Sequence, residues 1–274
     1  MTVGIGAVCE EGEQPEVVVA ADRMVTVGQT GGVEYEDTST KIEVLLDGEG
    51  ISAAVVGSGT STIIDSIIKT ARDYTAQNRI ETIGGAKDIV LSAYKTQVQE
   101  SVQNRVLSGM GYKLADFRDK EQDIPTEIQK EVLSASSELR QKMAKQAQIL
   151  LAVATENNAA IYLIAGNDYS NFSDIGYAII GSGTDSARLT FIRRSYDSTC
   201  EFPESLFTVA EAKSQAEERQ GVGQDMDLVR ISGKSINKFS NSEIKTIRKR
   251  LSDIKTAEME ARQNVITDWG RNTE

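Results

Sequence analysis

The sequence contains no histidine among its 274 residues, and its only cysteines are Cys9 and Cys200. The absence of imidazole excludes Ser-His-Asp and Cys-His nucleophiles, histidine-ligated zinc and imidazole general bases from this chain. The two cysteines have no CxxC spacing, so they indicate neither a thiolate zinc site nor a disulfide framework. We expect both to be reduced packing residues, and any catalysis must use another base.

Long apolar runs are also absent. None approaches the roughly 20 residues that span a bilayer, and the N-terminal sequence lacks the basic start and cleavage site of a signal peptide. We therefore expect a cytoplasmic protein without a membrane partner. The 41 acidic residues outnumber the 30 basic ones and give a net charge of −11, which repels a phosphate backbone, so nucleic acid is not an expected partner.

The first sixty residues predict strands, because their apolar runs are short, β-branched and bounded by polar or glycine-rich connections. The expected strands cover residues 2–8, 17–21, 41–46 and 51–56. A loop is predicted over 28–37, and Asp47-Gly48-Glu49-Gly50 supplies turn residues between the last two strands. These two strands therefore have the pattern of a hairpin.

Helical spacing follows, since apolar residues between Ile63 and Ala71 recur on one side of a helix. Further helices are predicted at 85–107, from Pro125 to 147, around 187–192 and at 205–219. A polar loop is predicted over 109–123, and strands at 149–155, 159–164, 176–180 and 226–231. This order of elements predicts an α+β fold in which two antiparallel sheets stack between helical layers.

The last thirty residues predict a long helix over 241–269. Ser240 and Glu243 have capping-box spacing, and apolar residues follow at helical intervals among many charges. We expect this helix to be an appendage that packs on its own body or on a partner.

Two features of the sequence suggest a binding or catalytic site. Gly57-Ser58-Gly59-Thr60 lies between a strand and a helix and could present backbone N–H groups to an anion. No Gly-Lys-Ser/Thr follows it and the GxGxxG spacing is missing, so it does not indicate a nucleotide site.

The second feature is the N-terminus. Removal of Met1, which would need no propeptide cleavage, leaves Thr2 with an α-amine beside its hydroxyl, and an amine with a pKa near 7.7–8.0 can serve as the base.

Four pieces of sequence occur in an order and approximate spacing that resemble those of a proteasome β-subunit of the N-terminal-nucleophile hydrolase superfamily. They are Thr2-Val3-Gly4-Ile5-Gly6, Val19-Ala20-Ala21-Asp22-Arg23, Lys41-Ile42 and Val55-Val56-Gly57. Ile180-Gly181-Ser182-Gly183 is similar to the Gly-Ser-Gly element of that family. The resemblance covers most of residues 2–231, and its motifs are concentrated in residues 2–70.

The resemblance implies a role for each matching residue. Thr2 would attack a scissile carbonyl and form an acyl-enzyme, and the charge of Lys41 would lower the pKa of the nucleophile and of the amine. Asp22 would fix Lys41, the N–H of Gly57 would stabilise the oxyanion, and Ser182 would complete the network near the α-amine. The implied partners are a peptide or protein substrate and further copies in a homo-oligomer or ring, and no metal or cofactor is implied.

The resemblance also implies a four-layer α/β/β/α sandwich. This domain would cover 1–233, with an inserted helical hairpin at about 108–145, and 234–274 would form a C-terminal helical extension. The family usually carries an Arg-Asp-Ser-x-Ser-Gly-like stretch near its last strand. Here Gln220 stands where the Asp is expected and Gly223 where the second Ser is expected, so the network that supports the threonine is altered.

Two alternatives remain at this point. The altered stretch and the extra helices also fit a catalytically silent proteasome-like subunit that builds or regulates an assembly. If an amine rather than water cleared the acyl-enzyme, the protein would be a transpeptidase or ligase. The sequence does not indicate which side chains the substrate carries.

Overall fold

The computed structural model describes residues 2–10, 14–27, 33–36, 40–117, 124–219 and 221–271. These ranges form an α+β fold with two five-stranded antiparallel sheets, as the order of apolar patterns predicts. No helix in the described ranges is both long and apolar enough to cross a membrane.

The first sheet has the strand order β10-β1-β2-β11-β12. Its strands are β1 (Val3–Cys9), β2 (Glu16–Asp22), β10 (Tyr177–Gly181), β11 (Met226–Ser232) and β12 (Ile236–Lys238). Every residue of β1 and β2 is buried, because both faces of this sheet are covered. The strands predicted at 2–8, 17–21, 176–180 and 226–231 are therefore confirmed within one or two residues.

The second sheet has the order β5-β6-β7-β8-β9. Its strands are β5 (Ile42–Gly48), β6 (Ile51–Gly59), β7 (Ala147–Thr155), β8 (Ala159–Ala165) and β9 (Asp168–Asn171). The hairpin of β5 and β6 is confirmed. However, β6 continues through Gly59 rather than ending at Val56, because Gly57 to Gly59 pair with Ile149 to Ala147 on β7.

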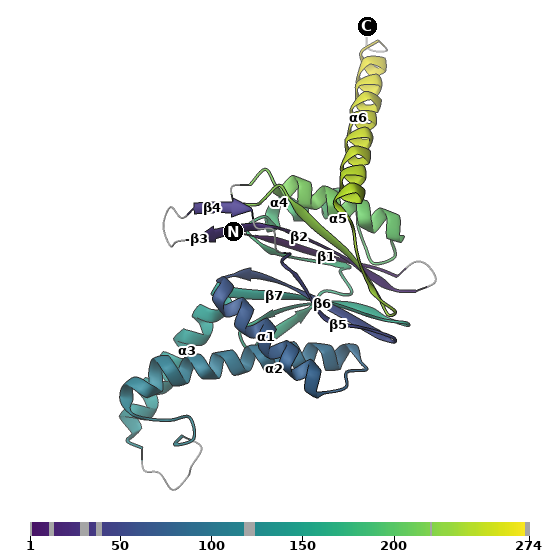
Figure 1. Ribbon diagram of the computed structural model, residues 1–274. Coiled ribbons are helices and arrows are strands. Elements are labelled where there is room, and N and C mark those ends of the chain that lie inside the picture. The colour runs from purple at the N-terminus through teal and green to yellow at the C-terminus, as the bar shows by residue number, and fades with distance from the viewer. Residues whose placement is uncertain are drawn as a thin grey trace.

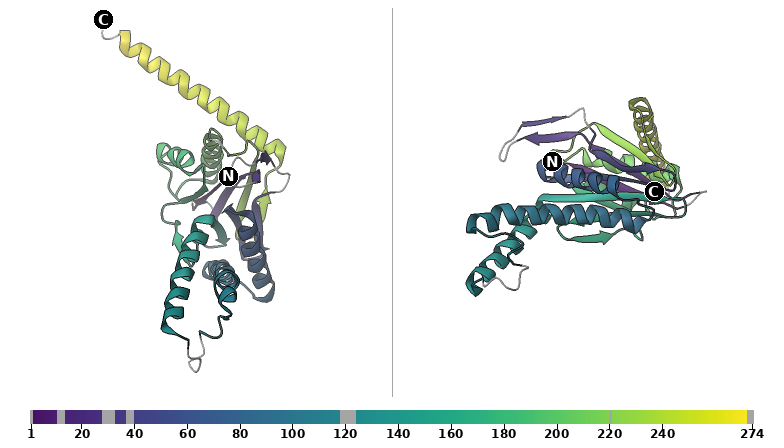
Figure 2. Two further views of the ribbon diagram at one scale, coloured as in Figure 1. Left: turned by 90° about the vertical axis from the view of Figure 1, so that its left-hand side faces the viewer. Right: turned by 60° about the horizontal axis from the view of Figure 1, so that its bottom comes forward.

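The helices cover the outer faces of the two stacked sheets (Figure 1). Helices α1 (Ser61–Gln77), α2 (Ile83–Val102) and α3 (Thr126–Gln146) lie on the second sheet, and α4 (Thr184–Arg193) and α5 (Phe202–Ala216) lie on the first. A π-helical turn (Gln103–Leu107) and a short 3-10 helix (Ser108–Met110) extend α2, and the far ends of α2 and α3 reach beyond the sheet (Figures 1 and 2).

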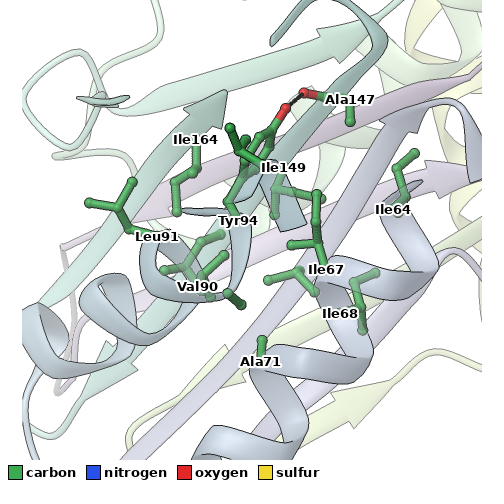
Figure 3. Packing of buried hydrophobic residues seen from close by; sticks show 14 of the residues in the cluster. Ile64, Ile67, Ile68, Ala71, Val90, Leu91, Tyr94, Ala147, Ile149 and Ile164 are labelled. Atoms are coloured by element: carbon green, nitrogen blue, oxygen red, sulfur yellow. Dashed lines mark hydrogen bonds between the residues drawn. The ribbon is translucent and has the colours of Figure 1, made fainter. Parts of the chain in front are cut away.

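Three apolar clusters hold these parts together: one between α1–α3 and the second sheet, one between the two sheets, and one between α4–α5 and the first sheet. Figure 3 shows the first, where Ile67 of α1 and Val90 of α2 pack toward Ile149 and Ile164 of the sheet. The buried Tyr94 hydroxyl donates to the carbonyl oxygen of Ala147 at 2.8 Å and so ties α2 to β7.

The segment predicted as a loop over 28–37 is partly a strand. Residues Val33–Glu36 (β4) pair with Met24–Val27 (β3) in a two-stranded sheet, whereas 28–32 and 37 lie outside the described residues. The prediction was therefore wrong over Val33–Glu36. Val, Glu, Tyr and Glu alternate as strand residues do, but the run is too short to stand out from its glycine-rich surroundings.

The long C-terminal helix is confirmed as α6 (Asn241–Arg271). Its capping box forms as expected: the Ser240 backbone N–H donates to Glu243 Oε2 at 2.7 Å, and the Glu243 N–H donates to Ser240 Oγ at 3.3 Å. The helix contacts the body as far as Glu258, which accepts from Arg194 at 2.5 Å, and its C-terminal end projects away from the sheets (Figure 2).

Candidate active site

Thr2 and Lys41 meet although 39 positions separate them. Thr2 directly precedes β1 and Lys41 directly precedes β5, so the two stacked sheets bring their ends together. Lys41 Nζ donates to Thr2 Oγ1 at 2.7 Å and also to the carbonyl oxygen of Met24. An ammonium group at this distance stabilises negative charge that develops on the hydroxyl oxygen.

Asp22 joins this pair from the end of β2. Its fully buried carboxylate accepts a hydrogen bond from Lys41 Nζ at 3.1 Å. The same oxygen, Oδ1, accepts from the Val3 N–H at 3.0 Å, and Oδ2 accepts from the N–H groups of Met24 and Gly223, both at 3.1 Å. With four donors the carboxylate is held in one orientation, and that orientation fixes Lys41 against Thr2.

Ser182 and its neighbour Gly181 lie against the other side of Thr2. The Ser182 N–H donates to the carbonyl oxygen of Thr2 at 2.8 Å, and Ser182 Oγ lies 3.4 Å from the same oxygen. Gly181 has φ +94°, and a Cβ built on it would stand 1.9 Å from the Thr2 oxygen. Only glycine allows the two backbones to approach this closely.

Gly57 is placed level with Lys41. The pairing of β5 with β6 ends at Ile42 and Val56, and Gly57 is the next residue along β6. A Cβ at this position would lie 2.2 Å from Ile64 Cγ2, so α1 packs directly on the backbone here. The structure thus brings Thr2, Asp22 and Lys41 into direct contact, and places Ser182 and Gly57 beside them.

Two contributors to this network were not identified from the sequence. In the sequence Gly223 is a departure from the family motif, yet its backbone N–H donates to Asp22. Gln220, the other departure, lies outside the described residues. Lys213 is fully buried on α5 and donates to the carbonyl oxygen of Gly223 at 2.5 Å. Its signal in the sequence was a charge inside the apolar pattern of 205–219, at a position that the helical spacing assigns to the core.

The cysteines lie apart from this network. Both are free, as expected. Burial raises the pKa of Cys9 to about 11 and also raises the pKa of the half-buried Cys200. Both thiols are therefore protonated at neutral pH and are weak nucleophiles.

Similarity to solved structures extends over nearly the whole chain. An Anbu (Gly-1) mutant from Hyphomicrobium sp. strain MC1 aligns with a TM-score of 0.61 at 11% identity, covering 95% of this chain and 97% of that one. Anbu (ancestral beta-subunit) from Yersinia bercovieri gives 0.61 at 10% identity, covering 94% and 96%. The helical assembly of the Anbu complex from Pseudomonas aeruginosa gives 0.58 at 11% identity, with the same coverage. These likenesses show a shared proteasome-like fold.

Similarity at the level of sequence is not detected. No protein-family model matches this chain, and no curated protein does either.

Proposed function

We propose that this protein is a threonine-type N-terminal-nucleophile hydrolase, similar to a proteasome β-subunit, that cleaves peptide or amide bonds. The observation that carries the proposal is the 2.7 Å contact between Thr2 Oγ1 and Lys41 Nζ, with Lys41 held by the buried Asp22. The two sheets between helical layers fit the four-layer α/β/β/α sandwich of that superfamily.

In the proposed reaction Thr2 must have a free α-amine, which requires removal of Met1. The amine takes the hydroxyl proton while Oγ1 attacks the scissile carbonyl, and Lys41 offsets the charge that develops on Oγ1. The N–H of Gly57 stabilises the oxyanion. Ser182 holds Thr2 in place by donating to the Thr2 carbonyl oxygen. The C–N bond of the substrate then breaks, and its leaving amine takes the proton from the Thr2 α-amine. Water hydrolyses the ester that remains on Thr2 Oγ1.

The test is the rate of labelling by a peptide epoxyketone, which needs both the hydroxyl and the free amine of the threonine. The untagged wild-type protein should be labelled, whereas Thr2→Ala should not react. Lys41→Ala should slow labelling by about a hundredfold or more, because the amine then retains its proton and the developing charge on Oγ1 has no cation beside it. The buried, protonated Cys9 offers little competing reaction.

The matched control is Thr256→Ala, which removes another threonine hydroxyl, one that donates within α6 to the carbonyl oxygen of Ser252 at 3.0 Å. It should be labelled at the wild-type rate. Equal labelling of Thr2→Ala and wild type would reject the proposal.

The second candidate is a catalytically silent subunit that builds an assembly. The observation in its favour is the projecting α6, on which Met259, Val265 and Ile266 are 65%, 69% and 53% exposed. Assembly is also compatible with catalysis, and a helical assembly is what the Pseudomonas aeruginosa Anbu complex forms. We therefore propose that copies of this chain associate through α6, whichever candidate holds.

A further inference from the structure

Lys213 is a fully buried lysine for which the proposed reaction has no use. Its Nζ donates to Glu217 Oε1 at 2.6 Å and to the carbonyl oxygen of Gly223 at 2.5 Å. Burial lowers the pKa of Lys213, and the contact with Glu217 opposes that shift. A buried ammonium costs free energy, and these two acceptors offset that cost.

Gly223 connects Lys213 to the nucleophile. Its carbonyl oxygen accepts from Lys213, and its N–H donates to Asp22 Oδ2 at 3.1 Å. Asp22 accepts from Lys41, which in turn donates to Thr2. A cation and a carboxylate thus hold the two backbone groups of one glycine, and Lys213 is close enough to Asp22 for their charges to interact.

Glu217 extends this chain of contacts to the C-terminal helix. Arg248 of α6 donates to both Glu217 oxygens, at 2.7 and 3.2 Å, and to the carbonyl oxygen of Gln224. The charged groups that act on Lys213 are therefore Glu217 on its own helix, Arg248 on α6 and Asp22 on β2.

We propose that Lys213 is a positioning residue for the Thr2 site. It fixes Gly223 so that the glycine N–H holds Asp22, and its charge offsets part of the negative potential that Asp22 imposes on Thr2 and Lys41. This role rests on the proposed function of Thr2 as the nucleophile. In the family stretch, Asp and Ser side chains would support the threonine. Here we assign that support to the backbone N–H of Gly223, which Lys213 holds in place.

The proposal predicts opposite pH effects for two neighbouring substitutions. Lys213→Met removes a positive charge near Asp22, so the pKa of the Thr2 amine should rise. The labelling rate increases as this amine loses its proton, so the midpoint of the pH profile should move to higher pH. Glu217→Gln removes a negative charge and leaves Lys213 and Arg248 less neutralised, so the rise should move to lower pH. Each shift should be about half a pH unit.

The experiment measures the epoxyketone labelling rate of the untagged full-length protein between about pH 6 and about pH 9, a range that brackets the ordinary pKa of an α-amine. The control is Arg194→Gln. Arg194 also links α6 to α5, through Glu258 at 2.5 Å and Glu211 at 2.9 Å, but none of its recorded partners contacts Gly223 or Asp22. It should leave the midpoint of the pH profile unchanged.

Each outcome decides the matter. Shifts of opposite sign in Lys213→Met and Glu217→Gln, with none in Arg194→Gln, support the role. If Lys213→Met fails to fold, the downward shift of Glu217→Gln is the deciding result. A lower rate with an unchanged midpoint in both variants means that Lys213 only stabilises the fold. If wild type is not labelled at any pH, the nucleophile proposal itself fails, and the role of Lys213 fails with it.

Discussion

At the level of single residues, both carboxylate oxygens of Asp22 are occupied. Three backbone N–H groups and the Lys41 ammonium donate to it, and it is fully buried. Arg23, the next residue, points elsewhere and pairs with Asp227 at 2.6 Å. The two neighbours thus have separate partners: the Asp22 carboxylate orients the site, and the Arg23 cation ties the end of β2 to β11.

The same scale gives a prediction for Gly181→Ala. The new Cβ would stand 1.9 Å from the Thr2 oxygen at a φ of +94°, so the backbone must shift. We expect a loss of about 1–3 kcal/mol in the free energy of unfolding, and slower labelling of Thr2. Urea unfolding measures the first effect. Gly84→Ala is the control, since its Cβ would meet nothing within 4 Å in helix α2, and it should not destabilise the protein.

The sequence identifies some site residues and cannot identify others. Thr2, Asp22 and Lys41 were predicted because their side chains carry the resemblance, and the structure brings them into contact. The contribution of Gly223 is a backbone N–H, which every residue except proline possesses, so residue type gives no sign of it. Lys213 stands at a position that the helical spacing of 205–219 assigns to the core, but a lysine is rarely buried there, so only the packing of α5 shows that its charge is enclosed.

At the level of elements, long periodic segments were predictable and short edge segments were not. The hairpin of β5 and β6 and the helices α1, α3 and α6 agree with their patterns. Strands β3, β4, β9 and β12 were missed. They have three or four residues each, β9 is exposed throughout, and their pairing depends on a neighbouring strand rather than on an apolar run.

The capping box gives the prediction at this level. Ser240→Ala removes the side-chain oxygen that accepts from the Glu243 N–H at 3.3 Å and donates to the Glu243 carboxylate at 2.6 Å. We expect a loss of about 1 kcal/mol in the stability of the first turn of α6. Faster hydrogen exchange of the amides in that turn would show it. Ser252→Ala, in the middle of the same helix, should have no such effect, and equal exchange in the two variants would contradict the assignment.

At the level of the whole molecule, the α+β architecture was predictable, because the order of apolar patterns agrees with the order of strands and helices. The proposed association of copies could not be predicted from the sequence, because the pattern of an exposed helix face does not identify what binds it. Met259 and Ile266 are exposed and seven residues apart on α6, so they share a face of the helix.

The proposed association through α6 predicts that Ile266→Lys lowers the mass of the particle in solution. A charge in an apolar contact must lose its water on association, which weakens it by several kcal/mol. Light scattering coupled to gel filtration measures the mass. Asn264→Lys adds the same charge on a different face of the helix and should retain the wild-type mass. If Ile266→Lys also retains that mass, copies do not associate through this face.

The central claim is that Thr2 is a nucleophile, and locating the epoxyketone adduct by peptide mass spectrometry tests it most directly. The untagged wild-type protein should lose Met1 and carry a single adduct on Thr2, joined through both Oγ1 and the α-amine. A protein that has lost Met1 and remains unlabelled at Thr2 by epoxyketones with several different side chains would contradict the claim and favour the silent subunit.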